Sequence, residues 1–346
     1  MTTTWPHSLT RTERTSPTAF GPPFDDTDAD IILRSSDQVD FHVYKVILSK
    51  ASPVFKVMFS DTTLNSRTIV DLPESSKTLA ALLTSIYPII PELETDEERS
   101  LNDHLAAISA VKKYDMALAS FHLLQDFEDS AYVKDSPVEA FCVAYALELR
   151  EAAQIAAKAS LKHRLSLDDI GNELRHTNGP ALFQLWQFHR ACSAVAVAAI
   201  PEDRNLTWIS QDVLRSWWEL VEPHRQMHCR CNKNSFLLGP RSHVQLWSDS
   251  GVVRDTTWEA HTSWNDYIKR ARNALKNHPC SEAVTHHDVL KPSYQIEPKC
   301  NECQRRICGL SEFSRYLGEE VEKRVSEVRK FLASCFDTVL TGFLFP

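Results

Sequence analysis

The stretch Asp28–Phe59 constrains the fold of this chain more than any other, because two strands and two helices fit into it with little room for other connections. Asp30–Leu33 predicts a buried strand, and Ser35–Asp37 predicts the turn after it. Gln38–Val43 alternates apolar and polar residues, which is typical of a strand with one buried face. The pattern therefore predicts a β-hairpin that leads directly into helices.

Two short helices are expected after this hairpin. Val46, Ile47 and Ala51 lie at helical spacing. Ser52 and Pro53 then supply an N-cap and a proline at the first helical position, which together mark the start of a second helix. We expect that helix to have an apolar face made of Val54, Phe55, Met58 and Phe59.

In these residues the chain resembles the BTB/POZ domain, and more narrowly the BTB proteins that are abundant in mushroom-forming (basidiomycete) fungi. The resemblance covers about residues 25 to 130. It rests on these motifs, in the family's order: Asp30-Ile-Ile-Leu33, Phe41-x-Val43-x-Lys45, Leu48, and Ser52-Pro53-x-Phe55-x-x-Met58-Phe59. It continues with a third strand at Thr68–Pro73 and with helices at Thr78–Pro88 and Leu105–Met116.

The resemblance implies an α/β domain that binds other polypeptides and commonly forms homodimers through its first helices and an N-terminal segment. It makes Asp30, Lys45, Phe55, Met58 and Phe59 determinants of the fold. The family brings Asp30 and Lys45 together in a small charged pocket, where breaking the pair would leave a charge without a partner. Tyr44 stands where the family most often has histidine, so a phenol is expected in place of a buried imidazole.

The whole chain predicts an α+β protein of several parts. Its 346 residues leave room for two or three domains, and only 8 glycines favour helices over sheets outside the first domain. We expect an N-terminal BTB/POZ α/β domain, then a mainly α-helical region, then a Cys/His-containing C-terminal module. The expected boundaries are a disordered tail at 1–24, the BTB domain at 25–130, a helical extension at 131–225, the Cys/His module at 226–310, and a C-terminal amphipathic helix and tail at 311–346.

Within the helical region, the serine-proline pair at Ser136-Pro137 predicts a helix over Val138–Leu161. Further helices are expected at Ala181–Ile200 and at Ser210–Glu222, the latter carrying Trp217 and Trp218 as core or groove residues. The apolar run Ala191–Ile200 is half of the ~20 residues that cross a bilayer, so we expect a buried helix there. The last helix is expected at Ser311–Phe336.

Charge and cysteine usage bound the location and the partners. A net charge of −8 argues against a non-specific nucleic-acid surface, because phosphate binding needs a concentrated positive field. The N-terminus shows no signal peptide, and the number of cysteines is 9, which is odd. We therefore expect thiols that stay reduced or bind metal, in the cytoplasm or the nucleus.

Two closely spaced thiol pairs, Cys229 with Cys231 and Cys300 with Cys303, predict a possible structural zinc site. Four protein ligands would leave no open position for catalysis. The alternative is separate free cysteines that behave as small buried hydrophobes, which is the expectation for Cys142, Cys192 and Cys335. A mixed Cys/His site would draw on His228, His278, Cys280 and Cys308.

Three hypotheses of function follow, and none is an enzyme, since no phosphate loop, nucleophile elbow or metalloprotease helix is found. The leading one is an intracellular interaction and oligomerisation protein. The second is a substrate adaptor of a cullin-type ubiquitin ligase, which is weakened because Leu64-Asn65-Ser66 has serine where cullin binders carry glutamate. The third is a zinc-containing nuclear regulator with a weak basic stripe at Lys269, Arg270, Arg272, Arg305, Arg306 and Arg315.

Overall fold

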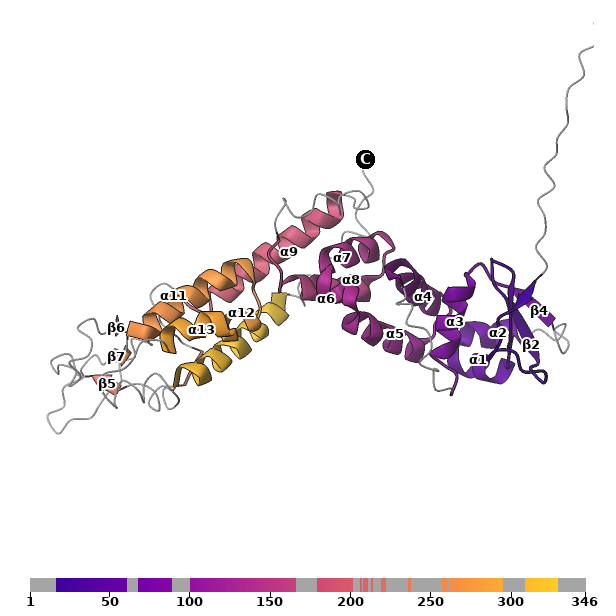
Figure 1. The fold of residues 1–346 in the computed structure, drawn as a ribbon, viewed down its shortest axis with the longest axis horizontal. Helices are drawn as coiled ribbons and strands as arrows, with labels where there is room; N and C mark the ends of the chain where they lie inside the picture. The colour runs from indigo at the N-terminus through magenta and orange to yellow at the C-terminus, as the bar shows by residue number, and fades with distance from the viewer. Residues whose placement is uncertain are drawn as a thin grey trace, which may run out of the picture. The chain divides into compact units, whose positions relative to one another are not determined.

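The computed structural model describes residues 17–60, 68–88, 100–165, 179–201, 206, 208–210, 213, 219–221, 236–237, 257–260, 262–294 and 309–328. The chain divides into two compact units, Met1–Ile155 and Ala156–Pro346. The boundary falls within the helix α8, Arg150–Ser160. Figure 1 shows the ribbon of both units and labels elements such as β2 in the first and α9 in the second.

A four-stranded sheet opens the first unit, in the order β1-β3-β2-β4. Its strands are β1 Thr18–Ala19, β2 Ile31–Arg34, β3 Val39–Val43 and β4 Thr68–Asp71. β2 and β3 are antiparallel, while β4 runs parallel to β2 and β1 runs parallel to β3. The hairpin and the third strand are thus confirmed, with bounds that differ from the predicted ones by one or two residues.

The turn between β2 and β3 is tighter than its sequence suggests. The Ser35 amide donates to the Val39 carbonyl, and the Gln38 amide donates to the Ser35 carbonyl. Gln38 has a φ of 63° and completes a three-residue loop that ends in a left-handed residue. This loop places Ile31 opposite Val43 and Leu33 opposite Phe41, and all four side chains are buried.

Residues 17–24, expected in a disordered tail, lie against the sheet in the structure. β1 pairs with β3 at Thr18 and Val39. Phe20 stacks on Phe41 with ring centroids 4.5 Å apart, and Phe24 is 1% exposed. The expectation of disorder is wrong for these residues, because packing the two phenylalanine rings buries a large apolar surface.

Helices make up the rest of the first unit. They are α1 Lys45–Ala51, α2 Pro53–Met58, α3 Ser76–Thr84, α4 Leu101–Lys113, α5 Ala117–Asp129, α6 Ala131–Asp135 and α7 Pro137–Ala146, followed by α8. Serine caps four of them, since the hydroxyls of Ser52, Ser75, Ser100 and Ser130 each accept from an amide in the first turn. The predicted helices at 78–88 and 105–116 correspond to α3 and α4.

The single helix predicted at Val138–Leu161 is two helices in the structure, α7 and α8. Leu149 donates its amide to the Ala144 carbonyl and Glu148 donates to Tyr145, which is the Schellman pattern of a helix end. Glu148 occupies the left-handed position with a φ of 57°. The break was missed because glycine, the usual residue at that position, is absent.

The second unit is also mostly helical where it is described. Its helices are α9 Gly179–Val197, α11 Thr262–Asn277, α12 Glu282–Thr285, α13 His287–Tyr294 and a helix over 309–328. Three short antiparallel strands, β5 Glu219–Val221, β6 Phe236–Leu237 and β7 Thr257–Ala260, pair in the order β5-β7-β6. The helix predicted over Ser210–Glu222 is therefore wrong at its end, and Trp217 and Trp218 lie outside the described residues.

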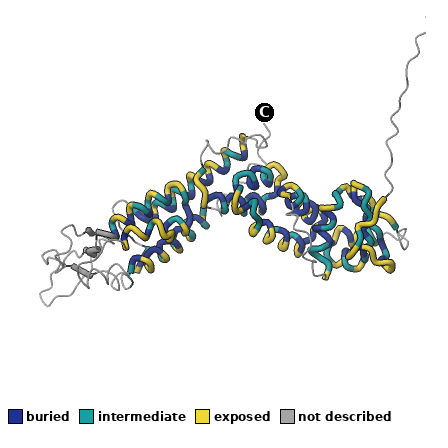
Figure 2. The backbone as a smooth tube through the Cα atoms, viewed as in Figure 1, coloured by how far each residue is buried: buried dark blue, intermediate teal, exposed yellow. Residues whose placement is uncertain are grey.

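An aromatic cluster forms the core of the second unit. Phe313 is fully buried, with its ring 5.2 Å from Trp264 and 6.2 Å from Tyr267. Figure 2 shows buried positions along the sides where α9, α11 and α13 meet. The alanine-rich run is buried, as predicted, at Cys192, Ala196, Ala199 and Ile200. No described helix combines the length and the apolar character that a bilayer crossing requires.

Candidate functional site

The α1–α2 hairpin of the first unit is held by one serine. Ser52 ends α1 and caps α2, because its Oγ accepts from the Phe55 amide at 3.0 Å. The same hydroxyl donates to the Tyr114 carbonyl at 2.5 Å, at the end of α4. Proline at position 53 has no amide proton to leave unsatisfied there. A local sequence signal thus also attaches the hairpin to a helix far along the chain.

The start of α1 is capped by Asp30, which comes from the beginning of β2. The residue at the N-cap position, Tyr44, makes no side-chain cap bond. Instead the Asp30 Oδ1 accepts from the Lys45 amide at 2.7 Å. A carboxylate at a helix N-terminus is favoured by the helix dipole. The structure therefore places the Asp30 carboxylate against the backbone amide of Lys45.

Tyr44 is half-exposed and its phenol is engaged by carboxylates. The Tyr44 Oη donates to Asp28 at 2.7 Å and to Asp26 at 3.1 Å. The hydrogen bond to Asp28 is the main reason that the pKa of Tyr44 is raised. The phenol that stands in place of the family's buried imidazole therefore makes its hydrogen bonds at the surface.

Behind the hairpin, two tyrosines fix its position. The Tyr44 amide donates to the Tyr87 Oη at 2.8 Å, and burial raises the pKa of Tyr87 to about 12. The ring of Phe55 stacks on Tyr114 with centroids 4.6 Å apart. Tyr114 in turn donates to Glu74 at 2.7 Å. The inner side of the hairpin is thus rigidly placed.

The outer side of the hairpin exposes valines beside two lysines, Lys50 and Lys56. Of the four residues expected on the apolar face of α2, only Phe55 is fully buried, while Met58 and Phe59 are half-buried. Val46 is 62% exposed, Val54 is 37% exposed and Val57 is 75% exposed. Valine is a weaker helix former than alanine, so these valines do not stabilise the helices. In a monomer their side chains leave apolar surface in contact with water.

Residues 23–122 match the family model of the BTB/POZ domain. These residues form a BTB/POZ domain. The match contains the sheet from β2 onward, the α1–α2 hairpin, α3, α4 and part of α5. No curated protein matches the chain at a significant level.

BTB domains are typically interaction modules without enzymatic activity, and their presence indicates protein partners and possible dimerisation. In this BTB domain, Asp30, Ser52 and Phe55 point inward to fold contacts, whereas the valines of α1 and α2 face solvent. These valines are thus among the apolar side chains that the domain leaves exposed.

The predicted zinc ligands Cys229, Cys231, Cys300 and Cys303 lie outside the described residues, as do His228, Cys308 and Cys335. Within the described ranges, no cluster of residues is arranged to hold a metal ion. Cys142, Cys192 and Cys280 are buried and form no disulfide, and burial raises the pKa of Cys280. Of the alternative ligands, His278 already uses its Nδ1 in a hydrogen bond of 3.0 Å with the Lys162 carbonyl.

Two residues of the predicted basic stripe are engaged within the second unit. Arg270 donates to the Val289 carbonyl at 3.0 Å and to the Ser293 hydroxyl at 2.5 Å. Arg315 donates to Glu319, one turn further along the helix. Arg305 and Arg306 lie outside the described residues. Arg270 and Arg315 are therefore engaged within the chain itself.

Proposed function

We propose that this chain is an intracellular protein–protein interaction and oligomerisation protein whose BTB domain self-associates through the outer side of the α1–α2 hairpin. One observation carries the proposal: Val46, Val54 and Val57 are exposed on two helices that pack against each other. Their inner sides are fixed by Ser52 and Asp30, so the hairpin cannot turn these valines inward without losing both caps.

Burying such a surface against a second copy of itself is favourable. Apolar area removed from water contributes roughly 25 cal/mol per Å². A twofold axis lets the same residues serve both subunits, which makes a symmetric dimer the simplest assembly. The location in the cytoplasm or nucleus and the likeness to fungal BTB proteins remain part of the proposal and rest on the sequence.

The test is the mass of the full chain in solution, measured by sedimentation velocity. We expect a homodimer for the wild type and a monomer for Val46→Asp combined with Val57→Asp. Each substitution would bury an unpaired carboxylate in the interface, which costs several kcal/mol. Both sites are mostly exposed in the single chain, so the helical circular dichroism signal should be unchanged.

Leu118→Asp is the matched control, because Leu118 is 64% exposed in the same unit but lies on α5. We expect this variant to stay dimeric. A wild-type chain that is monomeric at micromolar concentration, or a double variant that keeps the dimer mass, would refute the proposed interface. Dissociation by Leu118→Asp alone would place the interface on α5.

A role as substrate adaptor of a cullin-type ubiquitin ligase is a second candidate. The half-buried Met58 and Phe59 at the end of α2 favour it, since they leave apolar surface for a partner. The segment Leu64-Asn65-Ser66, where cullin binders carry glutamate, lies outside the described residues. Capture of a cullin by the wild type, lost when Met58 and Phe59 become aspartate, would support this role. Equal capture by both would contradict it.

A structural zinc ion, and with it a zinc-containing nuclear regulator, also remains a proposal. The spacing of Cys229 with Cys231 and of Cys300 with Cys303 supports it. Those four thiolates would hold the ion, which would order the surrounding loops. Metal analysis should then find about one zinc per chain in the wild type. Cys300→Ser combined with Cys303→Ser should lose it.

A further inference from the structure

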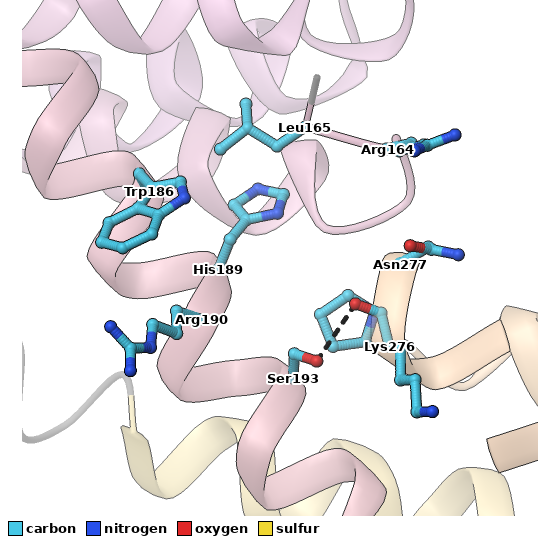
Figure 3. Close-up of a pocket in the computed structure, with 9 residues that line it drawn as sticks. Arg164, Leu165, Trp186, His189, Arg190, Ser193, Lys276 and Asn277 are labelled. Atoms are coloured by element: carbon cyan, nitrogen blue, oxygen red, sulfur yellow. Dashed lines mark hydrogen bonds between the residues drawn. The ribbon is translucent and has the colours of Figure 1, made fainter. Parts of the chain in front are cut away.

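The second unit contains a hollow of about 320 Å³ that lies outside the BTB domain. One wall is a face of α9, where Trp186, His189, Arg190 and Ser193 recur at helical spacing. The other walls come from Arg164 and Leu165, after α8, and from Lys276, Asn277 and Pro279 at the end of α11. We call these nine residues the α9 pocket (Figure 3).

Contacts between the walls hold the α9 pocket open in one shape. The Ser193 hydroxyl donates to the Lys276 carbonyl at 3.1 Å, which joins α9 to the end of α11 (Figure 3). The His278 Nδ1 lies 3.0 Å from the Lys162 carbonyl, and Lys162 pairs with Glu282. Each wall is therefore tied to another, and the pocket is formed before any ligand arrives.

The base of the pocket is neutral. The His189 Nε2 lies 2.8 Å from the Ser160 Oγ, and that hydroxyl donates to the Ala157 carbonyl at 2.7 Å. Ser160 must then accept from His189, so the imidazole carries its proton on Nε2. Burial lowers the pKa of His189 to about 4, and His278 and His163 act in the same direction. His189 thus adds shape and no charge at neutral pH.

The rim of the pocket carries the charge, and all of it is positive. Arg164, Arg190 and Lys276 are exposed, and no carboxylate is among the nine lining residues. None of the three forms an ion pair with the residues that the structure describes. The C-terminus of α11 opposes them with roughly half a negative charge, which is much less than three full positive charges.

An aromatic surface lies next to these cations. Trp186 is 45% exposed and stacks with Phe183, which is 54% exposed, at a centroid distance of 6.2 Å. The Arg190 guanidinium lies 5.5 Å from the centre of the Trp186 ring. Tryptophan and arginine are the residues most enriched at the energetic centres of protein interfaces.

We propose that the α9 pocket binds an acidic segment of a partner protein, with its carboxylates on the rim cations and an apolar side chain against Trp186. Figure 3 shows Arg190 on one side of His189, and Arg164 and Lys276 on the other. Cations that do not converge suit carboxylates spread along an extended peptide, whereas a single phosphate needs converging donors. This inference rests on the proposed function as an interaction protein and assigns one partner site to it.

The test measures binding of a fluorescein-labelled peptide to the full chain by fluorescence anisotropy. The peptide has glutamates on both sides of one leucine, and a second peptide has glutamine in place of each glutamate. We expect the acidic peptide to bind at low salt, the glutamine peptide to bind at least tenfold more weakly, and added salt to weaken the acidic peptide, because exposed charges are screened. Inorganic phosphate should not compete.

Charge-reversal variants locate the site. Arg190→Glu and Lys276→Glu should each weaken binding by about fivefold or more, since an attraction is replaced by a repulsion. Lys291→Glu makes the same change in net charge at an exposed position on α13 outside the pocket, and it should bind as the wild type does. Arg190→Lys should keep part of the affinity. Trp186→Ala should weaken both peptides.

Failure to bind the acidic peptide, or equal losses in Arg190→Glu and Lys291→Glu, would overturn the proposal. Tighter binding of a single-stranded oligonucleotide than of the acidic peptide, with that binding lost in the same variants, would also overturn the proposal. Sedimentation of Arg190→Glu separates this result from the proposed function. If the variant remains a dimer but loses the peptide, the pocket and the BTB interface are independent.

Discussion

At the scale of single residues, Ser52 shows how one hydroxyl serves both local and long-range structure. It accepts from the Phe55 amide and donates to the Tyr114 carbonyl, and it is fully buried. The sequence predicts the first bond, since serine before proline is a helix-start signal. The second bond depends on the position of α4 and has no local signal.

Ser52→Ala should destabilise the chain by about 2 kcal/mol, because it removes a cap and leaves a buried carbonyl without its donor. The measurement is the midpoint of urea unfolding. Ser100→Ala is the matched control, since Ser100 caps α4 at the surface with no such second bond to the backbone, and its loss should cost about half as much. Equal costs would show that the bond to Tyr114 contributes nothing.

His189 should make stability depend on pH. Its folded pKa is about 4, below the ordinary value of 6.5, because burial disfavours the imidazolium. The unfolded chain therefore binds the proton first, and stability is lost as pH falls from 6.5 toward 4. The loss should reach about 3 kcal/mol. Urea unfolding across this range should fall more steeply for the wild type than for His189→Gln, and parallel curves would contradict the assignment.

At the scale of elements, local sequence patterns mark where helices start but miss where some of them end. Serine marks the starts of α2, α3, α4 and α6. The ends of α4 and α7 are Schellman turns with Asp115 and Glu148 in the left-handed position. An acidic residue gives no signal there, so the break between α7 and α8 could not be predicted, and the sequence predicts one helix across both.

Two glutamate-to-glycine substitutions near the break between α7 and α8 should change the stability of the chain in opposite directions. Glu148→Gly should stabilise the chain by about 0.5–1 kcal/mol, because glycine adopts the left-handed conformation without strain. Glu151→Gly, three residues later in the first turn of α8, should destabilise it by about 1 kcal/mol. Urea midpoints of both variants check this. A loss of stability in both would mean that the Glu148 backbone is not strained.

At the scale of the whole molecule, the two units have separate buried cores. Leu82 is fully buried on α3 in the first unit, and Phe313 is fully buried among aromatic rings in the second. A core assembled from its own unit's residues can unfold by itself. The BTB match ends at residue 122, so the first unit also contains α6, α7 and the first half of α8 from the helical region that follows.

We expect Leu82→Ala and Phe313→Ala each to destabilise one unit only, by about 3–5 kcal/mol, because each leaves a cavity. Differential scanning calorimetry should resolve two transitions in the wild type. Leu82→Ala should lower the temperature of one and Phe313→Ala that of the other. A single transition lowered by both variants would show that the units unfold together.

The sequence by itself determined the hairpin of β2 and β3, the start of α2 at Ser52 and Pro53, the burial of the alanine-rich run and the BTB character of the N-terminal part. Each of these depends on neighbouring residues, whose periodicity and caps can be read along the chain. The tertiary structure alone decided that Asp30 caps α1, that Phe20 and Phe24 join the sheet, and that three separate segments enclose the α9 pocket. It also decided which valines stay exposed, because apolar character is the same in a core and at a surface, and only the arrangement of helices tells them apart.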